Sequence, residues 1–176
     1  MAHAEILQKE TPEYREKVQD PQSEKEPDYL ELGLILDATK SMKPWIDVAK
    51  ETLSEIIDSV VKESEEDGEN PLLVRVCFIG FRDHKDDERF SICPFTEDVK
   101  KVKEFMNNCI AEGGKDIPED VVGGLKMCLM QDWTNDSIKK VFMIGDAPCH
   151  GKKYSGELDD HFPDGSPEGL NIEELM

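Results

Sequence analysis

The stretch that decides the fold is LGLILDATKSM, which runs from Leu32 to Met42. Its apolar run stops at Asp37, and Thr39 and Ser41 follow at alternating positions. A continuous apolar run bounded by polar residues is typical of a buried strand in a parallel sheet. Open α/β sheets bind their ligands at the carboxyl ends of such strands. One carboxylate and two hydroxyl groups there would supply part of the oxygen shell that a hard cation such as Mg²⁺ requires.

The same loop also has a purely structural interpretation. An aspartate that follows a strand often makes a turn or caps a helix. Ser41, with Pro44 close behind it, would then simply begin the next helix. The loop alone leaves both interpretations open, and other segments have to decide between them.

Apolar patterns beyond this loop predict strands that alternate with helices. Alternation with short connections is typical of an α/β fold with a doubly wound, mainly parallel sheet and helices on both faces. The loop Arg82–Glu88 is too short for a crossover helix, so the strand after it should be a short antiparallel edge strand. Further strands are expected at Leu72–Gly80, Phe90–Phe95 and Ile138–Gly145, and helices at Trp45–Glu63, at Asp98–Ile110, from Pro118 onward and from Pro167 onward.

The length and the charge of the chain limit its organisation and its partners. The 176 residues are enough for one domain with a core: residues 1–28 are expected to be a flexible acidic tail and residues 29–176 the domain. The net charge of -19 argues against nucleic acid and anionic membranes as partners, because phosphate binding needs clustered Lys and Arg. Such acidity suits a basic partner or divalent cations, and more commonly it only reflects a well-solvated surface.

The cysteines and the hydropathy of the chain indicate its compartment. Five cysteines without Cys-x-x-Cys spacing, two of them within apolar patterns, are expected to be reduced thiols that are either in the core or semi-buried. The start of the chain lacks the apolar region of a signal peptide, and no apolar run approaches the ~18 residues of a membrane span. A cytosolic location is therefore expected.

Loops that leave the carboxyl ends of neighbouring strands converge in an open sheet. The Asp37 loop should therefore meet the loop that Asp146 opens in FMIGDAPCHG. The Gly-rich segment Glu112–Glu119, EGGKDIPE, feeds a helix, and its Asp116 would point into the same crevice. Three loops are thus expected to form one site.

Five segments of the chain resemble those of a known family. They are LDATKSM, FIGFRDHKDDERFSICPFT, EGGKDIPEDVVGGL, IGDAPCHGKKY and DDHFPDGSPEGL. Their order and spacing resemble the von Willebrand factor A domain found with eukaryotic alpha-type protein kinases, over roughly residues 30–176. The resemblance implies a Rossmann-like fold, a role in recognising protein partners, and a metal-ion-dependent adhesion site with the signature Asp-x-Ser-x-Ser, in which Thr is tolerated second. The implied ligands of a Mg²⁺ or Mn²⁺ ion are Asp37, Thr39, Ser41 and Asp146, and a partner's acidic side chain would complete the metal shell.

The second loop departs from the family pattern. The family usually takes a Thr hydroxyl from Gly-Asp-Thr-Pro-Glu, where this chain has KDIPE at Lys115–Glu119. Ile117 stands at the Thr position and cannot bind a metal. Asp116 would either replace the missing ligand or only cap a helix that starts at Pro118. In the first case three carboxylates would neutralise the cation more fully and make it less attractive to an acidic partner.

The carboxyl end of the sequence is a second departure. The family pattern continues past Met176 into at least one more strand, so the domain is expected to be incomplete there and to lack its last strand. The strand Ile138–Gly145 would then form an exposed sheet edge, which invites strand addition or self-association.

Enzymatic alternatives find little support in the residues. A haloacid-dehalogenase-like phosphatase also places an Asp after its first strand, but it needs Asp-x-Asp, whose second Asp acts as general acid and base. Thr39 stands there, and its hydroxyl does not titrate near neutrality. A glycine-rich nucleotide loop with its Lys is also absent from the sequence, so no catalysis is expected. A metal-free interaction scaffold with an acidic surface remains the main alternative to a metal site.

Several residues near the loops have two interpretations each. Met42, Trp45 and His150 are expected to form a rim for a partner, although Met42 and Trp45 could instead anchor the next helix and His150 could be solvated. Cys149 and His150 are not expected to form a catalytic pair, because adjacent side chains on an extended segment point to opposite faces. His84, in the acidic segment RDHKDD, could join a second cation site, although such charge runs usually form solvated loops.

Overall fold

The computed structural model describes residues 29–66 and 72–175, so the tail predicted for residues 1–28 lies outside the described part. The strands are β1 (Tyr29–Asp37), β2 (Leu73–Phe81), β3 (Phe90–Thr96) and β4 (Ile138–Ile144). The helices are a 3₁₀ turn η1 (Lys40–Met42), α2 (Ile46–Glu66), α3 (Val99–Asn108), α4 (Val121–Leu129), α5 (Lys152–Ser155) and α6 (Ile172–Leu175). None of the helices in these ranges is both long and apolar enough to cross a membrane.

The strands form one sheet in the order β3-β2-β1-β4. β1 pairs in parallel with β2 and β4, so Leu34 lies between Phe78 and Phe142. β3 pairs antiparallel with β2 at one edge, as the short loop between them predicts. The α/β fold with a mainly parallel sheet and one antiparallel edge strand is therefore confirmed.

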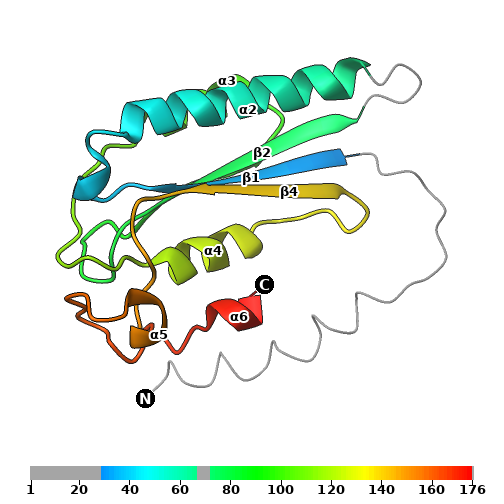
Figure 1. Cartoon of the computed structure of the whole chain (residues 1–176). Coiled ribbons are helices and arrows are strands. Elements are labelled where there is room, and N and C mark those ends of the chain that lie inside the picture. Colours follow the sequence, from blue (N-terminus) through cyan, green and yellow to red (C-terminus); the bar gives the residue numbers. More distant parts are fainter. Residues whose placement is uncertain (1–28, 67–71, 176) are drawn as a thin grey trace.

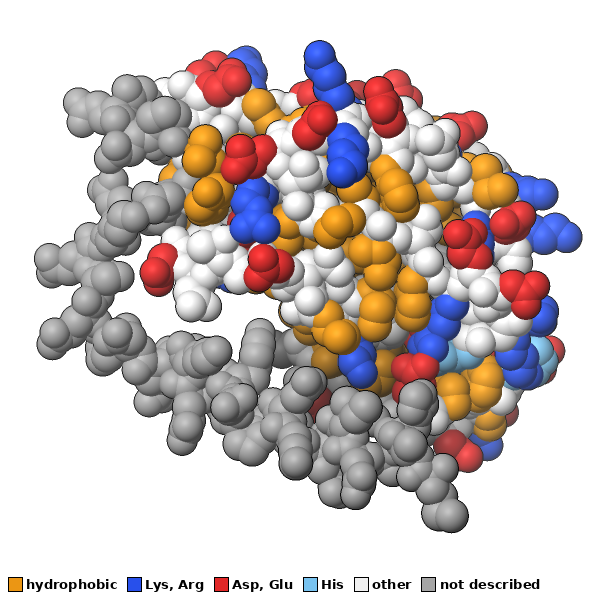
Figure 2. All heavy atoms as spheres, turned by 180° about the vertical axis from the view of Figure 1, so that it is seen from behind, with side chains coloured by type: hydrophobic (Ala, Val, Ile, Leu, Met, Phe, Trp, Pro, Cys, Tyr) orange, Lys and Arg blue, Asp and Glu red, His pale blue; other side chains and the backbone are white. Residues whose placement is uncertain are grey.

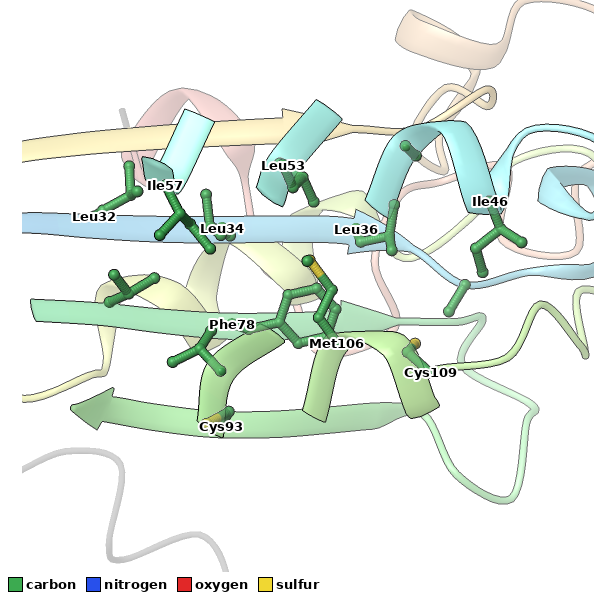
Figure 3. Close-up of a cluster of buried hydrophobic side chains, with 14 of the residues drawn as sticks. Leu32, Leu34, Leu36, Ile46, Leu53, Ile57, Phe78, Cys93, Met106 and Cys109 are labelled. Atoms are coloured by element: carbon green, nitrogen blue, oxygen red, sulfur yellow. The ribbon is translucent and has the colours of Figure 1, made fainter. Parts of the chain in front are cut away.

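Helices cover both faces of the sheet, with α2 and α3 on one face and α4 on the other (Figure 1). Alternate residues of β1 pack against α2 and α3, where the spacing of apolar residues on α2 brings one side of the helix onto the sheet. Figure 3 shows this core, including Leu32, Leu34, Leu36, Ile46, Leu53, Ile57, Phe78 and Met106. Each such side chain stabilises the fold by about 1.5–3 kcal/mol when fully buried.

The opposite face depends on a glycine in β1. A Cβ atom at Gly33 would lie 2.6 Å from Sγ of Cys128 in α4 and 3.2 Å from the ring of Trp133. The indole nitrogen of Trp133 donates to the carbonyl oxygen of Cys128 and holds the ring there. The glycine therefore allows α4 to pack closely on the centre of the sheet.

A buried carboxylate lies near the amino end of β1. Glu31 is fully buried, and its oxygens accept hydrogen bonds from Arg75 of β2 at 2.8 Å and from Thr134 and Ser137 in the turn before β4. Both carboxylate oxygens have partners, which is what a buried charge requires. Glu31 thus joins the three parallel strands at the end of the sheet opposite the polar loops.

We predicted that this helix starts at Pro118, but α4 begins at Val121. The amide of Glu119 donates to the carbonyl oxygen of Pro148, and Glu119 forms an isolated parallel bridge with Cys149. Asp120 caps the helix instead, since its Oδ1 accepts from the amide of Gly123 at 2.9 Å. Contacts between loops thus hold residues 118–120 outside the helix, although Pro118 suits a first helical position.

The segment after β4 is mostly irregular, but it contains the short helix α5. The helix predicted from Pro167 begins only at Ile172, as α6. Within the described ranges no strand pairs with the outer edge of β4, where the side chains of Val141 and Phe142 are 45% and 37% exposed. Figure 2 shows the side of the molecule turned away in Figure 1, where acidic and basic side chains surround a central group of hydrophobic ones.

Candidate metal centre

The loop after β1 forms a polar cluster because its short side chains bond to one another. Oδ1 of Asp37 accepts from both the amide and the hydroxyl of Thr39, at 2.9 and 2.7 Å. The hydroxyl of Thr39 lies 3.1 Å from that of Ser41. Asp37 and Thr39 are fully buried, so these oxygens are held in a water-poor environment.

The loop after β4 joins this cluster, as the sequence predicts. The hydroxyl of Ser41 donates to Oδ1 of Asp146 at 2.8 Å. A Cβ atom at Gly145 would lie 3.1 Å from Cβ of Asp37, so the two strand ends are in close contact. The structure therefore brings Asp37, Thr39, Ser41 and Asp146 together.

The loop before α4 adds a carboxylate that the sequence interpretation missed. A Cβ atom at Gly114 would lie 2.5 Å from Oε1 of Glu119 and 3.2 Å from Cβ of Thr39, so the three residues meet. Gly113 and Gly114 have positive φ values of 80° and 69°, a backbone conformation that glycine adopts without strain. Glu119 is 3% exposed. A Pro-Glu pair is typical of the first turn of a helix, which is why the sequence alone did not indicate this role.

Backbone hydrogen bonds connect the three loops. The amide of Lys40 donates to the carbonyl oxygen of Gly113, and the amide of Glu112 donates to that of Ala38. The bond from Glu119 to Pro148 connects the second and third loops. The oxygen donors are therefore held on a connected framework, which is the preorganisation that a metal site needs.

Two carboxylate oxygens of this cluster lack a hydrogen-bond partner among the described residues. They are Oδ2 of Asp37 and Oε2 of Glu119, and both are buried. Burial raises the pKa of Asp37, with a further contribution from the negative charge of Asp146. Burial, together with the charges of Asp37 and Asp83, raises the pKa of Glu119 to about 9. A buried polar atom without a partner is costly, and a bound cation would satisfy both oxygens.

The donor set fits a hard divalent cation. Three carboxylates and two hydroxyl groups offer only oxygen, which is the chemistry that Mg²⁺ and Mn²⁺ prefer. The residues that would hold the ion are Asp37, Thr39, Ser41, Glu119 and Asp146.

Asp116 lies elsewhere, in a neighbouring cluster of acidic and histidine side chains. Its Oδ2 accepts from the amide of His161 at 2.7 Å, and its Oδ1 lies 3.0 Å from Nδ1 of that residue. It does not cap a helix, because Asp120 does so. Neither role that we considered for Asp116 is therefore seen, and Glu119 supplies the carboxylate of the second loop. The side chain of Ile117 is 49% exposed and contributes nothing to the site.

Only one of the three residues expected at the rim is exposed. Trp45 is 60% exposed, whereas Met42 and His150 are buried. Met42 packs in the core between the sheet and α2. His150 is held between two carboxylates: Nε2 lies 2.8 Å from Oδ1 of Asp83, and Nδ1 lies 2.7 Å from Oδ1 of Asp160.

The chemistry of His150 follows from this geometry. Burial opposes its protonation, but the hydrogen bonds to Asp83 and Asp160 outweigh burial and raise its pKa. Both ring nitrogens are occupied, so His150 cannot act as a base towards Cys149. Burial also raises the pKa of the Cys149 thiol. All five cysteines have free, buried thiols in the described part of the chain, as expected from their sequence context.

Comparison with known proteins supports the resemblance on which the site was predicted. The family model of the von Willebrand factor A domain matches residues 31–162. The alpha-protein kinase vwkA of Dictyostelium discoideum is 31% identical over 149 residues, which cover 84% of this chain and 23% of that protein. The chain thus spans less than a quarter of that relative's length.

Solved structures of low sequence identity were also found. The vWF domain of the type V pili tip protein Mfa5 from Porphyromonas gingivalis superimposes with a TM-score of 0.47 and 17% identity, over 70% of this chain and 39% of that one. A structure of three N-terminal domains of Mfa5 gives a TM-score of 0.46 and 16% identity, over 68% of this chain and 20% of that one. On the match of the family model to most of its length, this chain belongs to the von Willebrand factor A domain family.

Proposed function

We propose that this domain binds a protein partner in a manner that depends on a divalent cation, Mg²⁺ or Mn²⁺. Domains of this family are generally interaction modules. The observation that carries the proposal is the pair of buried, unpartnered oxygens, Oδ2 of Asp37 and Oε2 of Glu119. Both oxygens belong to the loop cluster that also contains Thr39, Ser41 and Asp146. In a metal-free scaffold these oxygens would each need water or another partner, whereas one cation would satisfy both.

The residues of the cluster would have different roles in binding the ion. Asp37, Glu119 and Asp146 would neutralise the charge of the ion, and the hydroxyl groups of Thr39 and Ser41 would add neutral oxygens. Glu119 has to lose its proton for this, because its pKa lies near 9. When bound, the ion would offer an open coordination position to a carboxylate of the partner.

The exposed side chain of Trp45 gives the partner an apolar contact close to the cluster. Trp45 follows η1 after Lys43 and Pro44, and its amide donates to the carbonyl oxygen of Met42. Aromatic side chains are frequent at the centres of protein interfaces. We therefore place Trp45 beside the metal as part of the partner-binding surface.

Titration calorimetry of Mg²⁺ and Mn²⁺ into the chelator-treated protein tests the proposal. We expect saturable binding of one ion, and binding of an acidic peptide only after the ion has been added. If the peptide binds equally well in EDTA, the interaction does not use the metal. If neither ion binds, the metal-free scaffold becomes the better explanation.

We propose that the domain acts by binding and not by catalysis, because Thr39 stands where a haloacid-dehalogenase-like phosphatase needs its second Asp. The similarity to an alpha-protein kinase supports a regulatory or targeting role beside such a kinase. The free thiols favour a reducing compartment, and we propose the cytosol.

Self-association along β4 is a separate proposal that rests on the free edge of the sheet. In the described chain the outer backbone groups of β4 face no other strand, and an unpaired edge can add a strand from a second copy. Sedimentation velocity over a wide concentration range should show a dimer that forms as the concentration rises. A strict monomer at the highest concentration would exclude this mode of association.

A further inference from the structure

A second group of acidic and histidine side chains lies beside the first cluster. It includes Asp83 at the end of the β2 strand, Asp116 in the second loop and His161 in the segment after α5. One ligand atom from each residue lies within 4.8 Å of the others. None of these side chains belongs to the oxygen cluster around Asp37.

Asp83 and Asp116 have buried carboxylates in which only one of the two oxygens makes hydrogen bonds. The side chains of Asp83 and Asp116 are fully buried. Oδ1 of Asp83 is bonded to His150 and to the amide of His84, and Oδ2 of Asp116 is bonded to the amide of His161. The other oxygens, Oδ2 of Asp83 and Oδ1 of Asp116, find no hydrogen-bond partner among the residues that the structure describes. Each carboxylate is thus fixed by one oxygen and offers the other.

Negative charge is concentrated in this region. Asp83, Asp116 and Asp160 bring three carboxylates together, and His150 bridges two of them as a doubly hydrogen-bonded ring. Buried carboxylates without compensating charge are unfavourable. A divalent cation would add positive charge beside the two oxygens, Oδ2 of Asp83 and Oδ1 of Asp116, that have no hydrogen-bond partner in the described chain.

Two groups of residues that share Asp116 could hold a metal ion, and the geometry favours one of them. Asp116, His150 and Asp160 also lie close enough to hold an ion, but both nitrogens of His150 are already occupied by carboxylates. His161 is different: its Nδ1 lies 3.0 Å from Oδ1 of Asp116, and that oxygen makes no hydrogen bond within the described chain. Neighbouring ligand atoms on a metal with bonds of about 2.0–2.1 Å are themselves about 3.0–3.4 Å apart.

We propose that Asp83, Asp116 and His161 form a second cation site, which takes a transition-metal ion of the Zn²⁺ class. An imidazole nitrogen with two carboxylates suits Zn²⁺, whereas Mg²⁺ prefers oxygen alone. The side chain of His161 is 36% exposed, so the ion can enter from solvent along it. His150 is a positioning residue, because it orients Asp83 from outside the metal shell, as carboxylate–histidine pairs commonly do.

Zinc titration tests this site, and saturating Mg²⁺ is present so that Mg²⁺ occupies the first site and Zn²⁺ does not. We expect the parent chain to bind one Zn²⁺ ion, and His161→Ala and Asp116→Asn each to weaken binding by at least about 10-fold. Because His161 is partly exposed, its variant should fold normally, as judged by circular dichroism. Asp87→Asn is the matched control for Asp116→Asn, since it removes an exposed carboxylate outside the group and should bind zinc like the parent.

Two further measurements separate this site from the proposed magnesium site. Asp37→Asn should lose Mg²⁺ binding and keep Zn²⁺ binding. Co²⁺ added to the parent should give visible absorption bands of a nitrogen-containing site, and these should be absent in His161→Ala. The proposal is overturned if His161→Ala binds Zn²⁺ as the parent does, or if zinc binding disappears only in Asp37→Asn.

Discussion

Replacement of Asp37 by Asn is expected to abolish Mg²⁺ binding without destabilising the metal-free protein. The Asn side chain keeps an oxygen that can accept from the amide and hydroxyl of Thr39, so the loop should retain its shape. It loses the negative charge of a buried carboxylate whose Oδ2 has no partner in the described chain. The affinity should fall by more than about 100-fold, because even residues outside the metal shell contribute about 10–100-fold.

Thermal unfolding with and without Mg²⁺ measures the same effect as stability. At an ion concentration of about 100 times Kd, the parent should gain about 2.7 kcal/mol, and Asp37→Asn should gain nothing. Glu55→Gln removes an exposed carboxylate of α2 and is the matched control, which should behave like the parent. An equal gain in Asp37→Asn and in the parent would contradict the assignment of Asp37.

Replacement of Glu119 by Gln is expected to stabilise the metal-free protein above neutral pH. The pKa of Glu119 is about 9 in the folded chain, because of burial and the charges of Asp37 and Asp83, against an ordinary value of 4.5. Between these values the folded state binds more protons than the unfolded state, so the stability of the parent falls as pH rises. Gln carries no titrating proton, and its variant should not show this fall.

Thermal unfolding in EDTA between pH 4 and pH 9 measures the difference in stability between the parent and Glu119→Gln. At pH 8 we expect Glu119→Gln to exceed the parent by on the order of 2 kcal/mol, or about 4–8 °C in Tm, and the two should converge near pH 4. Parallel curves for parent and variant across this range would show that Glu119 does not titrate as described. Calorimetry in buffers of different ionisation enthalpy should also show that the parent releases a proton on binding Mg²⁺ and the variant does not.

Most of the fold could be predicted from the sequence because its signals are local. The apolar run that ends at Asp37 indicates a buried strand, and the apolar spacing from Ile46 onward indicates the helix that covers it. The shortness of Arg82–Glu88 indicates an antiparallel partner. Each of these signals depends on neighbouring residues and on general rules of chain connection.

The candidate site was predicted only in part. The residues that we placed wrongly are positioned by contacts between segments far apart in the sequence. The meeting of Asp37 with Asp146 follows from parallel topology and could be predicted. The role of Glu119 could not, since contacts of Glu119 with Pro148 and Cys149, far along the chain, hold it outside the helix. In the same way His150 was expected at the surface, and its burial depends on Asp83 and Asp160, which no local pattern brings to it.

The buried carboxylate of Glu31 determines how far β1 can slide against its neighbours. A shift of β1 by two residues would keep its apolar face inward but remove Glu31 from Arg75, Thr134 and Ser137, leaving a buried charge uncompensated. The same shift would move Asp37 by about 6.6 Å along the strand. Glu31 thus fixes the register of β1 against its neighbours. A residue at one end of β1 therefore determines the position of Asp37 relative to Asp146 at the other end.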